Sequence, residues 1–286
     1  MKRLTKNIYY HTTSDGINIG CVVGDEAAVC IDLPLDAEEA LEWKEQVQTL
    51  TDRPIRAVML TSSDRLNSEA VEAFGVMLIG HSSAFARPEL PPELASSIAN
   101  DQLPTVTAPL HTLPAVPQLT FDHALSVTLS EQPPLIVDIV HRGGYSLDAS
   151  MVAPRGTGVL FAGGLVATGQ PPALAEGDFP KWLDILAELK KTREYATVVP
   201  SRGSLASPLE AAEATIDYIK TAVSRVKALV RANRTRSDLA DLAQELTGQY
   251  QKSRLPDALP DADAIARIIR AGLERIYDDL KAGVAL

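Results

Sequence analysis

Short apolar runs broken by turn residues fill the first third of the chain. Val, Ile and aromatic residues with Gly and Asp between them are typical of strands, whereas apolar residues spaced three and four positions apart among charges are typical of helices. The pattern predicts strands at residues 8–10, 17–23, 27–32, 56–60 and 76–80, and helices at residues 37–50 and 68–74. Strands and helices alternate in this section, as they do in layered α/β proteins.

A proline-rich stretch separates this section from a second set of strands. Seven prolines within residues 86–117 interrupt regular structure around one expected helix at residues 93–100. Two strand-rich halves, each with its own helices, predict a four-layer αββα sandwich, which we assign to residues 1–206. The strands of the second half are predicted at residues 124–129, 135–140, 150–152, 158–161 and 197–199, and its helix at residues 179–191.

The remaining residues, 207–286, have a helical pattern. Ser207 followed by Pro208 matches a helix start, because Ser caps the first turn and Pro fits its first position. Apolar residues then recur at three- and four-residue steps, as at Ile265, Ile268 and Ile269. We expect this helical C-terminal extension to pack on the preceding domain or to mediate self-association with a second copy of the chain, since the intervening charges are mixed in sign.

Charge and composition narrow the classes of partner. The 286 residues include 27 Lys and Arg against 37 Asp and Glu, for a net charge of −10, which argues against nucleic acid as a partner. No apolar run approaches the ~20 residues of a membrane span, and the first residues lack a signal-peptide core. We therefore expect no membrane partner and a cytoplasmic location. Cys21 and Cys30 flank a turn that sets them opposite each other, and we expect both to be reduced thiols.

Four segments form a recognisable series along the chain. Residues 28–34 (AVCIDLP) end a strand with an aspartate, and residues 53–61 (RPIRAVMLT) form the next strand; residues 159–165 (VLFAGGL) and 198–203 (VVPSRG) follow later. In this order they resemble the metallo-β-lactamase superfamily, and the resemblance covers roughly residues 8–206. It implies the αββα fold and, for active members, hydrolysis at a dimetal centre held by imidazole and carboxylate ligands.

The same resemblance implies which residues stand at the seven metal-ligand positions. The family motif HxHxDH falls on residues 62–67 (SSDRLN), and three later ligands fall on residues 145, 164 and 202. A catalytic zinc normally takes three protein ligands, and only Asp64 keeps a group that commonly binds zinc. We therefore predict that no family-type metal centre assembles here, and we regard as vestigial the residues Ser62, Asp64, Leu66, Asn67, Tyr145, Gly164 and Arg202.

Asp64 and Arg202 are the most informative of these residues. A guanidinium stays charged and holds a carboxylate in a bidentate pair, so we expect an Asp64–Arg202 ion pair to fill the vacated site. Alternatively, polar groups there bind a small anion or act without metal; the ligand-binding candidates are then Asp64, His141, Tyr145 and Arg202. An atypical metal site built from Asp64, His141 and Asp148 is the least favoured arrangement. We expect His81 to be structural.

The sequence thus favours a metallo-β-lactamase-fold protein that has lost the dimetal site and serves as a non-catalytic binding or scaffold protein, with no metal or other cofactor. One alternative is a hydrolase of the same superfamily with a mono-metal or metal-free site. Another is a sensor of a small anion or other small molecule that uses Arg202. Fold alone does not decide among these, because one fold hosts many functions.

Overall fold

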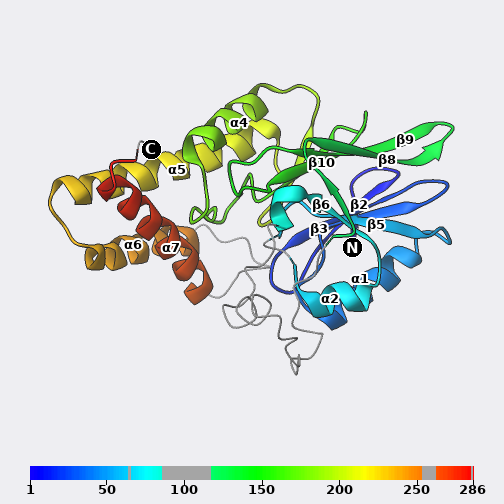
Figure 1. Ribbon diagram of the computed structural model, residues 1–286, viewed down its shortest axis with the longest axis horizontal. Helices are drawn as coiled ribbons and strands as arrows, with labels where there is room; N and C mark the ends of the chain where they lie inside the picture. The colour runs from blue at the N-terminus through cyan, green and yellow to red at the C-terminus, as the bar shows by residue number, and fades with distance from the viewer. Residues whose placement is uncertain (64–65, 86–116, 253–261, 285) are drawn as a thin grey trace, which may run out of the picture.

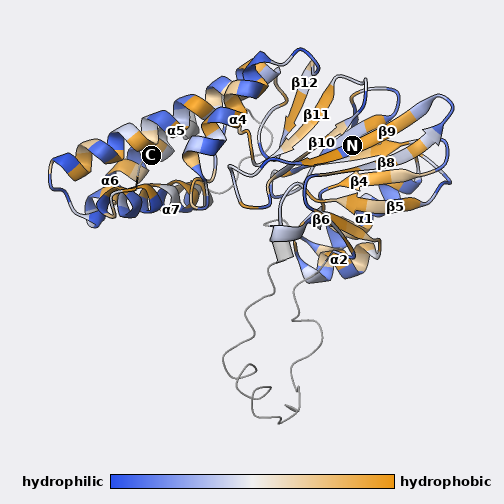
Figure 2. Ribbon diagram, turned by 45° about the horizontal axis from the view of Figure 1, so that its top comes forward, coloured by the Kyte–Doolittle hydropathy of each residue, from blue (hydrophilic) through white to orange (hydrophobic). Residues whose placement is uncertain are grey.

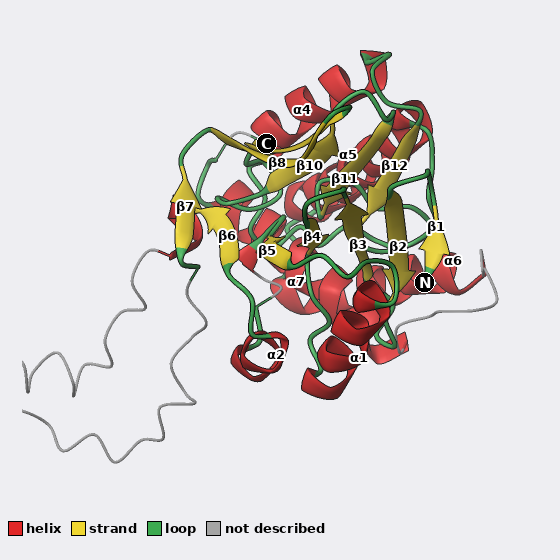
Figure 3. Cartoon of the chain, turned by 90° about the vertical axis from the view of Figure 1, so that its right-hand side faces the viewer, coloured by secondary structure: helices red, strands yellow, loops and turns green. Residues whose placement is uncertain are grey.

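Two β-sheets stack face to face, and helices cover the outer side of each (Figures 1 and 3). The computed structural model describes residues 1–63, 66–85, 117–252, 262–284 and 286. The helix expected at residues 93–100 lies outside these residues.

The first sheet has its strands in chain order, and among the described residues it contains seven. Strands β1 to β4 pair antiparallel, whereas β4 to β7 pair parallel. Two helices, α1 (Ala37–Gln48) and α2 (Ser68–Phe74), connect successive parallel strands. The strands are β1 (Lys2–Arg3), β2 (Ile8–Thr12), β3 (Asn18–Val23), β4 (Ala28–Ile31), β5 (Ile55–Met59), β6 (Leu78–His81) and β7 (Leu119–Phe121). A 3-10 turn, Ser82–Phe85, follows β6.

The second sheet has the order β12-β11-β10-β9-β8 and is antiparallel except for the β11–β12 pair. Its strands are β8 (Ala124–Glu131), β9 (Pro134–His141), β10 (Ser150–Pro154), β11 (Val159–Gly163) and β12 (Thr197–Pro200). The helices of this half are α4 (Phe179–Lys191), α5 (Pro208–Arg231), α6 (Leu239–Lys252) and α7 (Ala262–Lys281), with a 3-10 turn at Arg236–Asp238.

Three apolar clusters hold the layers together. Trp43 and Phe74 bury the inner faces of α1 and α2 against the first sheet. Residues such as Ile31 and Phe161 fill the space between the two sheets, where the strands of Figure 2 are mostly hydrophobic. Trp182 belongs to the third cluster, which joins the second sheet to the C-terminal helices. Helix, sheet, sheet and helix therefore succeed one another, and the αββα sandwich is confirmed.

The C-terminal helices form a three-helix unit beside the second sheet (Figure 1). Ser207 and Glu210 make a reciprocal capping box at the start of α5, as the Ser-Pro start predicts. Helix α7 is tied to the loop after β11, because Arg275 Nη1 donates to the Ala175 carbonyl at 3.0 Å. The domain boundary at residue 206 stays a prediction. Within the described part of the chain, no helix is long and apolar enough to cross a membrane.

Most predicted elements occur within a few residues of their expected bounds. Helix α2 matches the prediction residue for residue, and Cys21 pairs with Cys30 across β3 and β4. Both thiols are free and buried, and burial raises the pKa of Cys21 to about 12. The sequence pattern missed the short strands β1 and β7, because both owe their extended backbone to a pairing partner rather than to their own residues.

A buried carboxylate joins the ends of β4 and β5. Asp32 is 3% exposed and has a left-handed backbone, with φ of 55°. Its Oδ1 accepts from the Thr61 backbone N–H at 2.8 Å, and its Oδ2 accepts from Thr61 Oγ1 at 2.7 Å. The Thr61 carbonyl in turn accepts from the Ser150 N–H of the second sheet at 2.8 Å. Asp32 thus fixes the sheet edge at which the site lies.

Replacing Asp32 by alanine is expected to lower the free energy of unfolding by about 2–4 kcal/mol. The Thr61 N–H would be left buried without an acceptor, and alanine would be held at a positive φ. Asp36→Ala is the matched control: its carboxylate caps α1 through the exposed Glu39 N–H, so its loss costs only about 1 kcal/mol. Urea unfolding of both variants checks this, and equal losses would contradict the role given to Asp32.

Candidate functional site

Four of the positions that the resemblance matches to metal ligands lie just beyond strand ends. Ser62 follows β5, Tyr145 lies in the connection between β9 and β10, Gly164 follows β11, and Arg202 follows β12. Because these strands end at one side of the sandwich, Tyr145, Gly164 and Arg202 line a common cavity of about 240 Å³. Three of the residues that the resemblance singles out are therefore neighbours in the structure, and their role stays a prediction.

The Tyr145 ring packs so closely on Gly164 that residue 164 has no room for a side chain. A Cβ atom at residue 164 would lie 2.4 Å from Cε1 and 2.6 Å from Cζ of the Tyr145 ring. The ring also packs against Trp182, edge to face, at 5.5 Å between centroids. The aromatic ring therefore occupies the space in which the side chain of an aspartate at residue 164 would begin.

Three of the other vestigial positions have structural partners. Asn67 caps α2, its Oδ1 accepting from the Glu69 N–H at 2.8 Å and the Ala70 N–H at 3.3 Å. Leu66 packs on the apolar cluster beneath α1 and α2. Ser62 is buried, and its Oγ lies 3.4 Å from Asp148 Oδ1. None of the three lines the cavity.

Arg202 pairs with a residue that the sequence analysis did not select. Its Nη1 donates to the Asp15 carbonyl at 2.5 Å, and its Nη2 lies 3.6 Å from Asp15 Oδ2. Asp15 is in the turn between β2 and β3, which the isolated bridge between Ile17 and Arg202 brings next to the end of β12. Asp64, the expected partner of Arg202, lies outside the described residues, so the Asp64–Arg202 pair stays a prediction.

His141 lies in a separate polar cluster and does not line the cavity. Its ring stacks on His81, with 3.6 Å between centroids, and its Nε2 is 2.8 Å from the Leu147 carbonyl. His81 contacts the Asp122 carbonyl and Ser83, as expected of a structural histidine. Burial lowers the pKa of His141, and the neighbouring His81 and Lys181 lower it further, whereas the bond to Leu147 opposes the shift.

Asp148 is also occupied by protein partners. This carboxylate is buried and accepts from the Ser63 N–H at 2.5 Å and from Ser146 Oγ at 2.7 Å, in addition to its contact with Ser62. These bonds anchor the loop between β9 and β10 to the end of β5. Across the part of the chain that the structure describes, no group of three or more His, Cys, Asp or Glu side chains is arranged to hold a metal ion.

The cavity contains two further residues that sequence reasoning missed. Ser201 is 8% exposed, and its hydroxyl makes no hydrogen bond to the residues described here. Ile268 enters from helix α7, far along the chain. No local pattern singles out either residue, because both reach the cavity only through tertiary packing. The remaining walls are mostly apolar, formed by Leu35, Gly164, Val166, Ala167, Pro171, Pro172 and Ala173.

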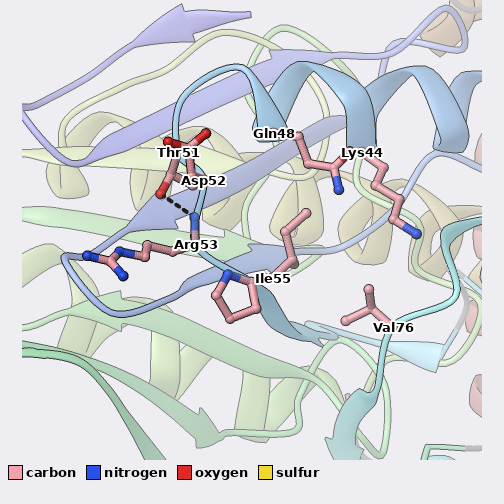
Figure 4. A pocket seen from close by; sticks show the side chains of 8 residues that line it. Lys44, Gln48, Thr51, Asp52, Arg53, Ile55 and Val76 are labelled. Carbon is pink, nitrogen blue, oxygen red and sulfur yellow. Dashed lines mark hydrogen bonds between the residues drawn. The ribbon is translucent and has the colours of Figure 1, made fainter.

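A second, larger hollow lies at the opposite end of strand β5 (Figure 4). Its volume is about 520 Å³, and Lys44, Asp52 and Arg53 contribute charged groups to its rim. The Lys44 ammonium donates to the Phe74 carbonyl at 2.7 Å, which ties it to the end of α2. None of these residues is buried, so this hollow has the character of an open surface between α1 and β5.

Comparison with solved structures identifies the fold. The metallo-β-lactamase from Pontibacter korlensis is 18% identical, with a TM-score of 0.57 over 77% of this chain and 97% of that one. The DIM-1 metallo-β-lactamase is 14% identical, with a TM-score of 0.56 over 77% of this chain and 96% of that one. The chain thus has the metallo-β-lactamase fold. No family model and no curated protein sequence matches it.

Gly164→Ala is expected to lower the free energy of unfolding by about 1–3 kcal/mol, because the new methyl group overlaps the Tyr145 ring. In a Tyr145→Ala background the same substitution should cost less than half as much, since the overlapping atoms are gone. Gly248→Ala in α6 is the control: nothing lies near its Cβ position, so helix propensity should stabilise the protein by up to about 1 kcal/mol. Additive losses in the double-mutant cycle would contradict the coupling of Tyr145 and Gly164.

His141 is expected to titrate below its ordinary pKa of 6.5 in the folded protein. As the pH falls below 6.5, His141 is therefore protonated in the unfolded chain before it is protonated in the folded protein. The stability that His141 contributes is fully present above that range and is lost as the pH drops from about 6.5 through the lowered folded-state pKa. Proton NMR of the imidazole, with His141→Gln to assign its signal, measures the pKa directly. A folded-state value above 6.5 would show that the bond to Leu147 outweighs burial.

Proposed function

We propose that this chain is a protein of the metallo-β-lactamase fold that binds a small molecule at the vestigial site and does not catalyse metal-dependent hydrolysis. The observation that carries the proposal is the Tyr145 ring, which lies against Gly164 where a bridging carboxylate would have to project. A dimetal centre needs a ligand at that point under the resemblance to the family. Tyrosine and glycine together remove both the ligand and the room for it.

The chemistry of the neighbouring positions supports the same conclusion. An amide that caps a helix, a leucine in an apolar cluster and a serine hydrogen-bonded to Asp148 are not a ligand set for zinc, iron or manganese. Without such a set, no bound water would have its pKa lowered to generate hydroxide. Asp64, outside the described residues, is the one carboxylate at these positions.

The cavity itself supports a binding role. It is lined mainly by apolar side chains with a few convergent polar groups, Tyr145, Ser201 and Arg202, and this is the usual make-up of small-molecule sites. Its volume of about 240 Å³ lies below the range of about 300–1,000 Å³ that is typical of drug-sized ligands. The ligand is therefore small. A scaffold role through self-association of the C-terminal helices stays a prediction.

Metal analysis tests the first half of this proposal. Protein purified without chelators and then loaded with zinc, iron or manganese is expected to retain well below one metal ion per chain, and none of these metals should raise the Tm. An active metallo-β-lactamase treated in parallel is the control for the loading procedure. Hydrolysis of β-lactam and thioester substrates should not exceed the buffer rate.

Stoichiometric metal together with metal-dependent hydrolysis would overturn the proposal in favour of a rebuilt hydrolase site. Asp64→Ala, His141→Ala and Asp148→Ala would then show whether these residues are the ligands, because removing a true ligand lowers metal content as well as activity.

A further inference from the structure

The cavity beside Arg202 has a polar end that is held rigidly by the backbone. The Ser201 N–H donates to the Gly163 carbonyl, and the Ser201 carbonyl accepts from the Asn18 N–H, both at 2.8 Å. The Asn18 side chain also donates to the Pro200 and Gly203 carbonyls, each at 2.9 Å. The turn that carries Ser201 and Arg202 is therefore fixed before any ligand arrives, which lowers the entropic cost of binding.

Ser201 supplies a donor that none of the described residues uses. The residue is more than nine-tenths buried, and its hydroxyl makes no hydrogen bond to the residues that the structure describes. The hydroxyl oxygen itself keeps some access to solvent, so an acceptor on a ligand would replace water there. Because Ser201 lines the cavity, an acceptor atom of a bound molecule would satisfy it.

Arg202 supplies the charge. Among the described residues that line the cavity, it is the one with a permanently charged side chain. The Arg202 side chain is about one-quarter exposed, and the nearby Asp15 carboxylate, at 3.6 Å, offsets part of its charge. A cation and a hydroxyl donor next to each other on one turn are suited to a carboxylate, whose two oxygens accept from both.

The rest of the cavity lining is mostly apolar and includes a residue of the C-terminal helices. Ile268 of α7 lines the same cavity as Val166, Pro171 and Pro172. Helix α7 cannot move freely, because Gly272 packs against Leu174 so closely that a Cβ atom there would lie 2.8 Å from Leu174 Cβ. Helix α7 thus contributes a fixed part of the apolar wall.

We propose that this cavity binds a short-chain organic acid, with its carboxylate on Ser201 and Arg202 and its hydrocarbon chain against Ile268. Water occupies about 30 Å³ per molecule, so a cavity of about 240 Å³ holds a ligand of roughly eight non-hydrogen atoms, the size of hexanoate. The inference rests on the proposed function, since it assigns the ligand class of the same site. It makes Ile268 the residue that determines chain-length specificity.

The test is calorimetric titration of the full chain with acetate, butanoate, hexanoate and decanoate, and with hexanamide as the uncharged match. Affinity should rise roughly fourfold per buried methylene up to hexanoate and fall for decanoate, which is too long. Hexanamide should bind at least about tenfold more weakly than hexanoate. Failure of every acid to bind, or equal affinity for hexanoate and hexanamide, would overturn the assignment.

Four variants test which residues contact the carboxylate of the ligand and which contact its hydrocarbon chain. Ser201→Ala should weaken hexanoate binding about tenfold. Asp15→Asn should strengthen it about threefold, because the competing carboxylate is removed while the Asp15 carbonyl still holds Arg202. Ile268→Ala should move the optimum to a longer acid. Ile216→Ala, at a partly buried isoleucine of α5 that does not line the cavity, should leave the optimum unchanged.

These results separate the two proposals. An unchanged optimum in Ile268→Ala, with thermal unfolding showing a folded protein, would remove Ile268 from the site. Metal-free protein that binds no acid would overturn the ligand class alone, whereas metal-dependent hydrolysis would overturn the proposed function whatever the acids do.

Discussion

The bond from Asp32 to Thr61 is the constraint on which the site geometry depends. A carboxylate with 3% exposure accepts both from the backbone and from the hydroxyl of one residue, so it fixes the direction in which the chain leaves β5. The Thr61 carbonyl then accepts from Ser150, which couples that exit to β10 of the other sheet. Ser62 and the loop of Asp148 follow directly from this junction. One buried carboxylate thereby fixes the position of the two sheets relative to each other at the edge where the cavity lies. The left-handed backbone of Asp32, with φ of 55°, is the conformational cost of this arrangement.

Tyr145 and Gly164 act as one packing unit. The ring is fixed between Trp182 and the Cα of residue 164, and interiors packed at this density tolerate few changes of volume. A side chain at residue 164 therefore requires a smaller residue at 145, and the two positions are constrained together rather than singly. The small residue at 164 is thus what makes room for an aromatic side chain at this edge of the sandwich.

Local sequence patterns predicted the fold well and the site only in part. Alternating and helical periodicities located nearly every described strand and helix, and the start of α5 followed from Ser207 and Pro208 alone. The resemblance brought Tyr145, Gly164 and Arg202 to one edge, and the structure places them around one cavity. Asp15, Ser201 and Ile268 escaped notice because their roles depend on contacts between distant parts of the chain: Asp15 meets Arg202 across 187 residues. Such contacts leave no period or spacing in the sequence.

The chemistry available at Arg202 favours recognition over catalysis. A guanidinium stays protonated at any ordinary pH, so it orients and neutralises an anion but neither accepts a proton from water nor delivers one to a leaving group. Asp15 beside it limits the charge that the cavity presents, and so limits the affinity for free inorganic anions, which gain nothing from the apolar walls. A ligand that also buries a hydrocarbon chain against Val166 and Ile268 gains, in addition, the free energy of removing that apolar surface from water. The balance between a partly neutralised cation and an apolar wall therefore selects amphipathic acids over bare anions, and helix α7 sets how long their chains are.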